Sequence, residues 1–332
     1  MTDQQAVAAV EVRGLVKSYG SIEAVRGIDL SISPGEVFGF LGPNGAGKST
    51  TISILCTLLR PTSGLARVAG IDVTRDPGGV RRRIGLVFQD PSLDDQLTAR
   101  ENLEFHAFLY GVPRAQRRER IDQALEMVEL QERGGSQVKT FSGGMKRRLE
   151  IARGILHHPQ VLFLDEPTLG LDPQTRNRIW AYLHDLRKRE GITIFMTTHY
   201  MDEAELCDRI GVIDNGRIVA EGSPDELKAM VGGDVVTVTA AVPQAAADEI
   251  RRAFELEPIV DGRSLRVEVP DGAAFVPRVV RELTVPLTAV TLSRPSLDDV
   301  FLKLTGHAIR DEGAGQLDQM RRFAAAFTRR GR

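Results

Sequence analysis

The sequence predicts an α/β fold built on a parallel sheet, with antiparallel strands before it, a helical insertion within it and a small α+β domain after it. One sign is an apolar strand at 37–41 that runs directly into a glycine-rich loop and an apolar helix. Two later apolar runs, at 161–164 and 192–196, end in polar residues, as buried parallel strands often do. Beyond 232 the pattern alternates between strand and helix periodicity.

Length and composition exclude several classes of protein. The 332 residues are 42% hydrophobic and 27% charged, which suits one large domain and one small one. A net charge of -2 gives no general attraction to nucleic acid, so we expect no nucleic-acid partner. No apolar run reaches the roughly 18 residues that cross a bilayer, which predicts a cytosolic protein. Cys56 and Cys207 lack metal-ligand spacing and are expected to be reduced structural thiols.

Short antiparallel strands are expected from Val10 to about Ile32, with turns at Gly14, Gly20 and Gly27. Tyr19 lies between two of these strands. Its ring offers a π face on which an adenine base can stack, although a tyrosine in a strand is more often a packing residue.

The glycine-rich loop has the spacing G-x-x-x-x-G-K-[ST]. Glycines let successive backbone N–H groups point at phosphate oxygens, and the following helix aims its positive end at the same anion. The lysine brings a positive charge to the β and γ phosphates, and the serine hydroxyl suits Mg²⁺. We therefore expect a nucleoside triphosphate site at Gly42, Pro43, Asn44, Gly45, Ala46, Gly47, Lys48, Ser49 and Thr50.

Further strands are expected at 66–73 and 84–88, and a helical insertion at 98–158. Gln89 follows the second strand. Its amide can bind Mg²⁺ or an attacking water, although a glutamine at a strand end is usually just solvated. The insertion has two apolar stripes of the kind that face a core, which are Leu103, Phe105, Phe108, Leu109 and Ile121, Leu125, Val128, Leu130.

One helix of this insertion is expected to begin at Ser142, as N-cap, with Gly143 and Gly144 in its first turn. The residues that follow are basic, although the positive end of a helix favours carboxylates. An anion from elsewhere would explain the mismatch, because exposed N–H groups and a serine hydroxyl can bind a phosphate. The alternative is an ordinary capped helix.

Two carboxylates follow the apolar run at 161–164. Asp165 lies at the carboxyl end of a central strand, where ligands bind in open α/β sheets, and is expected to orient Mg²⁺ and its waters. Glu166 is then placed to hold or deprotonate the water that attacks the γ phosphate. Acids after a strand can also simply begin a loop, and Asp172 can serve only as the N-cap of the next helix.

His199 follows the strand at 192–196, at the edge of the sheet where Lys48 and both carboxylates are expected. A lone histidine is usually structural. Its place at this shared edge favours a contact between His199 and the γ phosphate.

Together these residues resemble the nucleotide-binding domain of ABC transporters over roughly residues 10–230. The Ser-Gly-Gly sequence at 142–144 is the specific feature, because other P-loop NTPases share the phosphate loop and the strand acids. The resemblance implies a head-to-tail homodimer in which ATP lies between the loop at 42–50 of one subunit and the Ser-Gly-Gly sequence of the other.

The same resemblance implies a role for each remaining polar residue. Tyr19 would stack on adenine, and Gln89 would sense Mg²⁺ and couple to a membrane partner. Asp172 would contact the other subunit across the dimer, and His199 would hold the γ phosphate. Because Glu166 is also present, the resemblance implies a site that hydrolyses ATP.

Phe141 and Met145 depart from most ABC signatures, which carry Leu and Gln at these positions. This variant, together with the runs at 165–173 and 294–306, looks like the daunorubicin-resistance type of drug-export ATPase subunit. Such subunits pair with separate membrane permeases, which implies a peripheral protein at the cytoplasmic face of the membrane that powers efflux of a drug or other hydrophobic compound. The alternative is a soluble ABC ATPase acting on a partner such as the ribosome.

The expected domain organisation has three parts. Residues 8–231 form a P-loop NTPase (ABC ATPase) core with an antiparallel β subdomain and a helical subdomain at about 92–158. Residues 232–308 form the small α+β domain, which has no recognisable catalytic cluster. Residues 309–332 form a flexible basic tail that suits an anionic membrane surface, although a solvated terminus is the commoner outcome.

Overall fold

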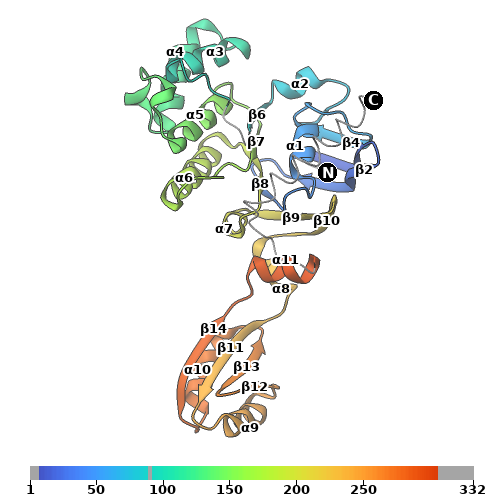
Figure 1. Ribbon diagram of the computed structural model, residues 1–332, viewed down its shortest axis with the longest axis vertical. Coiled ribbons are helices and arrows are strands. Elements are labelled where there is room, and N and C mark those ends of the chain that lie inside the picture. The colour runs from blue at the N-terminus through green and yellow to red at the C-terminus, as the bar shows by residue number, and fades with distance from the viewer. Residues whose placement is uncertain (1–6, 89–91, 306–332) are drawn as a thin grey trace, which may run out of the picture.

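The structure is a computed structural model that describes residues 7–88 and 92–305. Gln89 and the tail at 309–332 lie outside the described residues, so the expectations for them stay predictions. Figure 1 shows a large α/β body above and a small sheet-and-helix body below, with α8 (Pro224–Ala229) and α11 (Leu297–Thr305) between them. The boundaries expected at 231/232 and 308/309 stay predictions too.

The large body is built on a six-stranded sheet with the strand order β10-β9-β3-β8-β7-β6. Its strands are β3 (Val37–Leu41), β6 (Ile84–Val87), β7 (Val161–Asp165), β8 (Thr193–Thr198), β9 (Arg209–Asp214) and β10 (Arg217–Gly222). All neighbours are parallel except β9 and β10. The strands β3, β7 and β8 are buried along their whole length, as expected for parallel strands covered on both faces.

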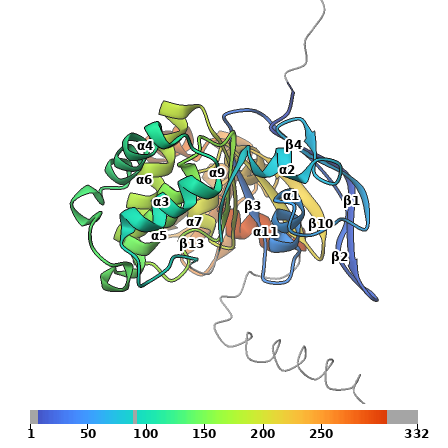
Figure 2. The same ribbon diagram turned by 90° about the horizontal axis from the view of Figure 1, so that it is seen from above.

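An antiparallel sheet, β2-β1-β4-β5, covers one side of this body (Figure 2). It comprises β1 (Val10–Tyr19), β2 (Ile22–Ile32), β4 (Ser63–Val68) and β5 (Ile71–Asp72), and it shares one core with α1 (Lys48–Leu55) and a face of the central sheet. The predicted turn at Gly20 is correct. Gly14 and Gly27 instead lie inside strands with positive φ, where β1 and β2 shift register, so the expectation of turns there was wrong.

Helices form the opposite side of the body in both views (Figures 1 and 2). They are α3 (Ala99–Leu109), α4 (Arg114–Met127), α5 (Gly143–Ile155) and α6 (Pro173–Glu190), while α2 (Pro77–Arg81) and α7 (Met201–Ala204) are short. The predicted stripe 121–130 is buried. Of the predicted stripe on α3 only Leu103 is buried, and the buried face consists of Ala99, Asn102, Leu103 and Ala107, three or four residues apart.

The other members of that predicted stripe point outward. Phe105 and Phe108 are 60% and 64% exposed, and Leu109 is exposed as well. Phe105 follows Leu103 by two residues, which places the two side chains on opposite sides of a helix. Large apolar side chains therefore lie on the outer face of α3.

The small body is a four-stranded antiparallel sheet, β12-β13-β11-β14, with two helices and its own core. Its elements are β11 (Asp234–Ala240), α9 (Pro243–Phe254), β12 (Ile259–Asp261), β13 (Ser264–Val269), α10 (Gly272–Glu282) and β14 (Leu287–Ser293). All but the short β12 were expected from periodicity.

After the small body, the chain returns to the large one through α11. Leu297, Val300 and Phe301 are buried in the core that contains α6 and the far face of the central sheet. The Lys303 ammonium donates to the carbonyls of Met230 (3.1 Å) and Val231 (2.6 Å) just after α8. The last described helix is therefore part of the large body rather than of the small sheet.

We expect Phe301→Ala to destabilise the large body by about 3–5 kcal/mol, because it removes a buried aromatic side chain and leaves a cavity. Urea denaturation followed by circular dichroism measures the change. Leu302→Ala, on the exposed side of the same helix, is the matched control and should have little effect. Equal losses in the two variants would contradict the packing described for α11.

Candidate functional site

The glycine-rich loop follows β3 and leads into α1, and two of its glycines are required by their surroundings. A Cβ on Gly42 would lie 2.2 Å from the Ile213 carbonyl oxygen, and one on Gly47 would lie 2.5 Å from that of Ala24. Gly47 also has a φ of 109° and is the N-cap of α1, without a side-chain acceptor for the first helical N–H groups. The loop therefore leaves backbone donors at a helix start, the arrangement that binds phosphate.

Lys48 is buried at the start of α1. Its ammonium donates to the carbonyls of Gly42 (2.7 Å) and Pro43 (3.1 Å) and lies 3.6 Å from Glu166 Oε1. Burial lowers the Lys48 pKa, and the carboxylates of Glu166 and Asp165 oppose that shift. The lysine is thus held as a buried cation between the loop and the carboxylates.

Ser49 and Asp165 meet beside Lys48, although 116 residues separate them in the sequence. Ser49 Oγ donates to Asp165 Oδ1 (3.3 Å), and Thr197 Oγ1 at the end of β8 donates to the same oxygen (2.5 Å). The described residues contain no group of three or more His, Cys, Asp or Glu that could hold a metal ion. Magnesium in nucleotide sites usually needs only one or two carboxylates plus phosphate oxygens, so Ser49 and Asp165 fit such an ion.

Glu166 follows β7 with a φ of 47°, a conformation uncommon for a residue with a side chain. Its backbone N–H donates to Thr197 Oγ1 (3.0 Å), and its Oε1 accepts a hydrogen bond from His199 Nδ1 (3.3 Å). Burial raises the Glu166 pKa, but the hydrogen bond from His199 and the charge of Lys48 outweigh burial, and the net pKa lies below the ordinary value. Glu166 is therefore an ionised carboxylate in contact with both the lysine and the histidine.

A second group of predicted residues lies where α5 and α6 begin. Ser142 caps α5 by accepting from the Met145 N–H (3.3 Å), and Asp172 caps α6 by accepting from the Thr175 N–H (3.0 Å). Hydrogen bonds from Thr175 lower the Asp172 pKa. A Cβ on Gly144 would lie 2.6 Å from the Thr175 Cγ2, so the two helix starts are in close contact.

These two groups are separated within one chain. Figure 1 shows α5 and α1 on opposite sides of β7 and β8. Gly143 is the first residue of α5. Tyr19 is the last residue of β1, its ring is half-exposed, and the Lys17 ammonium lies 5.0 Å from the centroid of that ring. The structure thus brings Lys48 together with the strand-end residues, and it places α5, which the Ser-Gly-Gly sequence begins, on the other side of β7 and β8 from α1.

The basic residues after Ser142 have acceptors within the chain. Lys146 pairs with Asp95 (2.7 Å), and Arg147 turns inward to pair with Glu150 (3.1 Å) and with backbone carbonyls near Glu166. An absent anion is therefore not required to explain them. Sequence reasoning missed the Arg147–Glu150 pair. Its only signal was an arginine and a glutamate three residues apart among the apolar positions of a helix.

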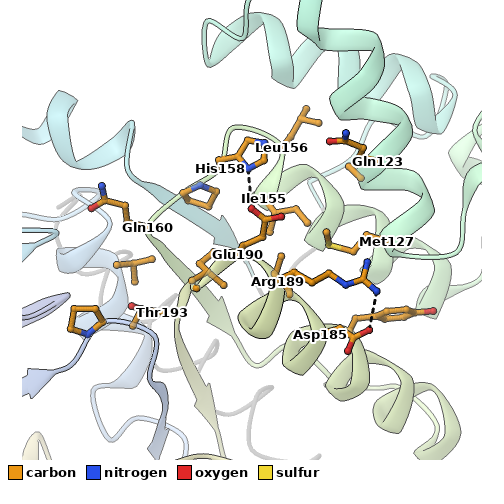
Figure 3. Close-up of a pocket in the computed structure, with 18 of the residues that line it drawn as sticks. Gln123, Met127, Ile155, Leu156, His158, Gln160, Asp185, Arg189, Glu190 and Thr193 are labelled. Carbon is orange, nitrogen blue, oxygen red and sulfur yellow. Dashed lines mark hydrogen bonds and ion pairs between the residues drawn. The ribbon is translucent and has the colours of Figure 1, made fainter.

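A cavity of about 930 Å³ lies at the other end of the parallel strands. It is lined by the first residues of β7 and β8, by α4 and by the ends of α5 and α6 (Figure 3). Among the side chains drawn there, His158 lies 3.3 Å from Glu190, and Arg189 lies 3.6 Å from Asp185. The residues predicted to bind nucleotide follow the opposite ends of these strands, so this cavity is not the phosphate site.

Two protein families match the chain. The family described as "ABC transporter" matches residues 25–169, and the family described as "ATP-binding protein DrrA1-3-like, C-terminal domain" matches residues 222–305. None of the helices in the described part of the chain is both long and apolar enough to cross a membrane.

Curated relatives match almost the whole chain. The daunorubicin/doxorubicin resistance ATP-binding protein DrrA of Streptomyces peucetius is 43% identical, over 96% of this chain and 99% of that protein. The linearmycin resistance ATP-binding protein LnrL of Bacillus subtilis (strain 168) is 38% identical, over 91% of this chain and all of that protein. Among solved structures, a dimeric post-hydrolysis state of an ATP-binding cassette bound to ADP and Pi is 32% identical, with a TM-score of 0.59, over 64% of this chain and 98% of that one.

Proposed function

The chain belongs to the ABC transporter ATP-binding proteins of the daunorubicin-resistance type, and from this premise we propose that it hydrolyses ATP to power efflux of a drug or other hydrophobic compound through a separate permease. The observation that carries the proposal is the connected set of Lys48, Asp165, Glu166 and His199 at one edge of the sheet. The names of the drug-resistance relatives favour export over the ribosomal alternative.

In this site each side chain has a distinct task. The loop N–H groups and Lys48 bind the phosphates, and Tyr19 stacks on the adenine. Ser49 and Asp165, with Gln89, would hold Mg²⁺, which neutralises charge on the phosphate oxygens. Glu166 accepts a proton from the attacking water, while His199 orients that carboxylate and contacts the γ phosphate.

Two chains complete the site. Figure 1 shows α5 and α1 on opposite sides of β7 and β8, and the capped start of α5 at Ser142, Gly143 and Gly144 suits the phosphates held by another subunit. Solved relatives of the cassette are dimeric, which supports a head-to-tail homodimer here. Asp172, beside Ser142, would then lie at the contact between subunits.

The exposed apolar face of α3 supports docking of a permease at the cytoplasmic face of the membrane. Phe105 and Phe108 lie on this face, three residues apart on the helix, and most of each side chain is exposed. Adjacent exposed aromatic side chains are typical of a protein interface rather than of free surface.

We expect the tagged full-length chain, purified from native membranes, to carry a multi-span permease that mass spectrometry identifies. Replacing Phe105 and Phe108 together by serine should reduce permease recovery at least about tenfold, because loss of two anchors costs more than about 1.4 kcal/mol. Val280→Ser, an exposed apolar position on α10, is the control. Recovery of ribosomes in place of a permease would contradict the proposed function.

A further inference from the structure

Arg147 is a buried arginine in the second turn of α5, and its side chain reaches two strand ends. It is 7% exposed. Its guanidinium donates to the carbonyls of Pro167 (2.6 Å), Asp165 (3.1 Å) and Glu166 (3.1 Å), which all follow or end β7. It also donates to the carbonyl of Phe88, just after β6. One side chain thus joins α5 to the backbone on both sides of the predicted base.

Arg147 donates a hydrogen bond to Glu166, a residue whose backbone is strained. Glu166 has a φ of 47°, and a positive φ costs an L-residue of order 1 kcal/mol or more, so its surroundings must hold it there. Its N–H is bound by Thr197 and its carbonyl by Arg147. The same carbonyl also accepts from the Leu169 N–H (3.3 Å), so removal of the arginine would release one of the hydrogen bonds that hold the Glu166 backbone.

Arg147 also connects Glu166 to the start of α5, where the Ser-Gly-Gly sequence lies. Arg147 is five residues after Ser142 on one continuous helix, so it moves with the Ser-Gly-Gly sequence. Glu150, which is fully buried, pairs with Arg147 and accepts from the N–H of Ser92 (2.8 Å). Arg147 and Glu150 thereby also fix both flanks of residues 89–91.

We propose that Arg147 is a positioning residue that makes the start of α5 and Glu166 move together, and so couples the two ATP sites of a dimer. The proposal rests on the proposed function. In the head-to-tail dimer, Ser142 of one subunit faces the nucleotide bound by its partner, whereas Glu166 of that same subunit serves its own nucleotide. Closure of one site would thus set the geometry of the base in the other.

The neighbouring arginine provides a matched comparison. Arg148 donates to the Val128 carbonyl (3.1 Å) just after α4 and to the Tyr182 hydroxyl (3.3 Å) on α6, so its acceptors do not lie at the strand ends. Both arginines hold α5 in place, but only Arg147 of the two contacts the backbone of Glu166. If Arg147 were merely structural, substitutions at the two positions would have the same kinetic signature.

The test compares Arg147→Gln, Arg147→Lys and Arg148→Gln in the purified full-length chain. Steady-state ATP hydrolysis gives kcat, KM and the Hill coefficient, and thermal unfolding reports whether each variant folds. Arg147→Lys keeps a charge beside Glu150 but lacks the planar five-donor fork, so it stays informative if the glutamine variant fails to fold.

For the wild type we expect a Hill coefficient approaching 2, the number of sites. In Arg147→Gln we expect kcat to fall about 10- to 100-fold, because the base is misplaced, and the Hill coefficient to fall to about 1 with little change in KM. Arg147→Lys should be intermediate, and Arg148→Gln should retain the cooperativity.

Three results would overturn the coupling. They are a Hill coefficient unchanged in both Arg147 variants, the same loss of cooperativity in Arg148→Gln, and non-cooperative hydrolysis by the wild type. In each of these cases the chain still hydrolyses ATP, so the proposed function stands. A wild-type chain that binds ATP but never hydrolyses it would instead contradict the proposed function itself.

Discussion

Replacement of Glu166 by glutamine is expected to abolish ATP turnover while ATP binding persists. The amide keeps the shape of the side chain and can still accept a hydrogen bond from His199, but it cannot take a proton from water. General-base catalysis is typically worth about 10²–10⁴-fold in rate, so kcat should fall by at least about 100-fold. Because ATP is bound but not consumed, the variant should accumulate as a nucleotide-bound dimer.

Phosphate release measures the loss of turnover, and size-exclusion chromatography with and without Mg-ATP measures the dimer. Glu190→Gln is the control, because this exposed carboxylate lies at the cavity of Figure 3, away from the phosphate loop. It should hydrolyse ATP at the wild-type rate. Undiminished hydrolysis by Glu166→Gln would refute the role of Glu166 as base, and a variant that stays monomeric with ATP would argue against the shared site.

Replacement of Lys48 by alanine is expected to lower the affinity for ATP by about 100-fold. The ammonium is the buried cation of the loop, and hydrogen bonds from a charged donor contribute about 1.5–3 kcal/mol each. Alanine also leaves the buried Glu166 carboxylate without its cation, which adds repulsion toward the phosphates. Both effects weaken binding.

Titration with a fluorescent ATP analogue measures this affinity. Lys188→Ala, on the exposed end of α6, removes an equal charge from the surface and should bind ATP like the wild type. Thermal unfolding of both variants distinguishes lost binding from lost folding. Unchanged affinity in Lys48→Ala would contradict the phosphate site, whatever its effect on hydrolysis.

The parts of the fold that could be predicted are those in which local sequence and tertiary role agree. The strands β3 and β7 are continuous apolar runs because both faces are covered, and the loop after β3 has glycines because a Cβ at Gly42 or Gly47 would collide with backbone. Parallel strands end at one edge, which is why Asp165 and His199 could be expected near Lys48 from their order alone.

The parts that could not be predicted depend on contacts between distant segments. Phe105 and Phe108 are as apolar as any core residue, and periodicity alone does not tell which apolar face of a helix is covered. The inward turn of Arg147 could not be predicted, because its acceptors are backbone carbonyls after β6 and at the end of β7 that no side-chain pattern reveals. Likewise, the run at 294–306 contributed only to the family resemblance, and the packing of α11 against the large body was not predicted.

The return of α11 to the large body means that the small sheet is inserted between two anchored segments rather than appended to a free end. A protein shortened before Leu297 would keep the whole sheet yet lose Val300 and Phe301 from the interior of the ATPase. Truncations meant to isolate the catalytic half would therefore damage it, and any force applied to the small sheet would reach the nucleotide-binding half along two covalent connections.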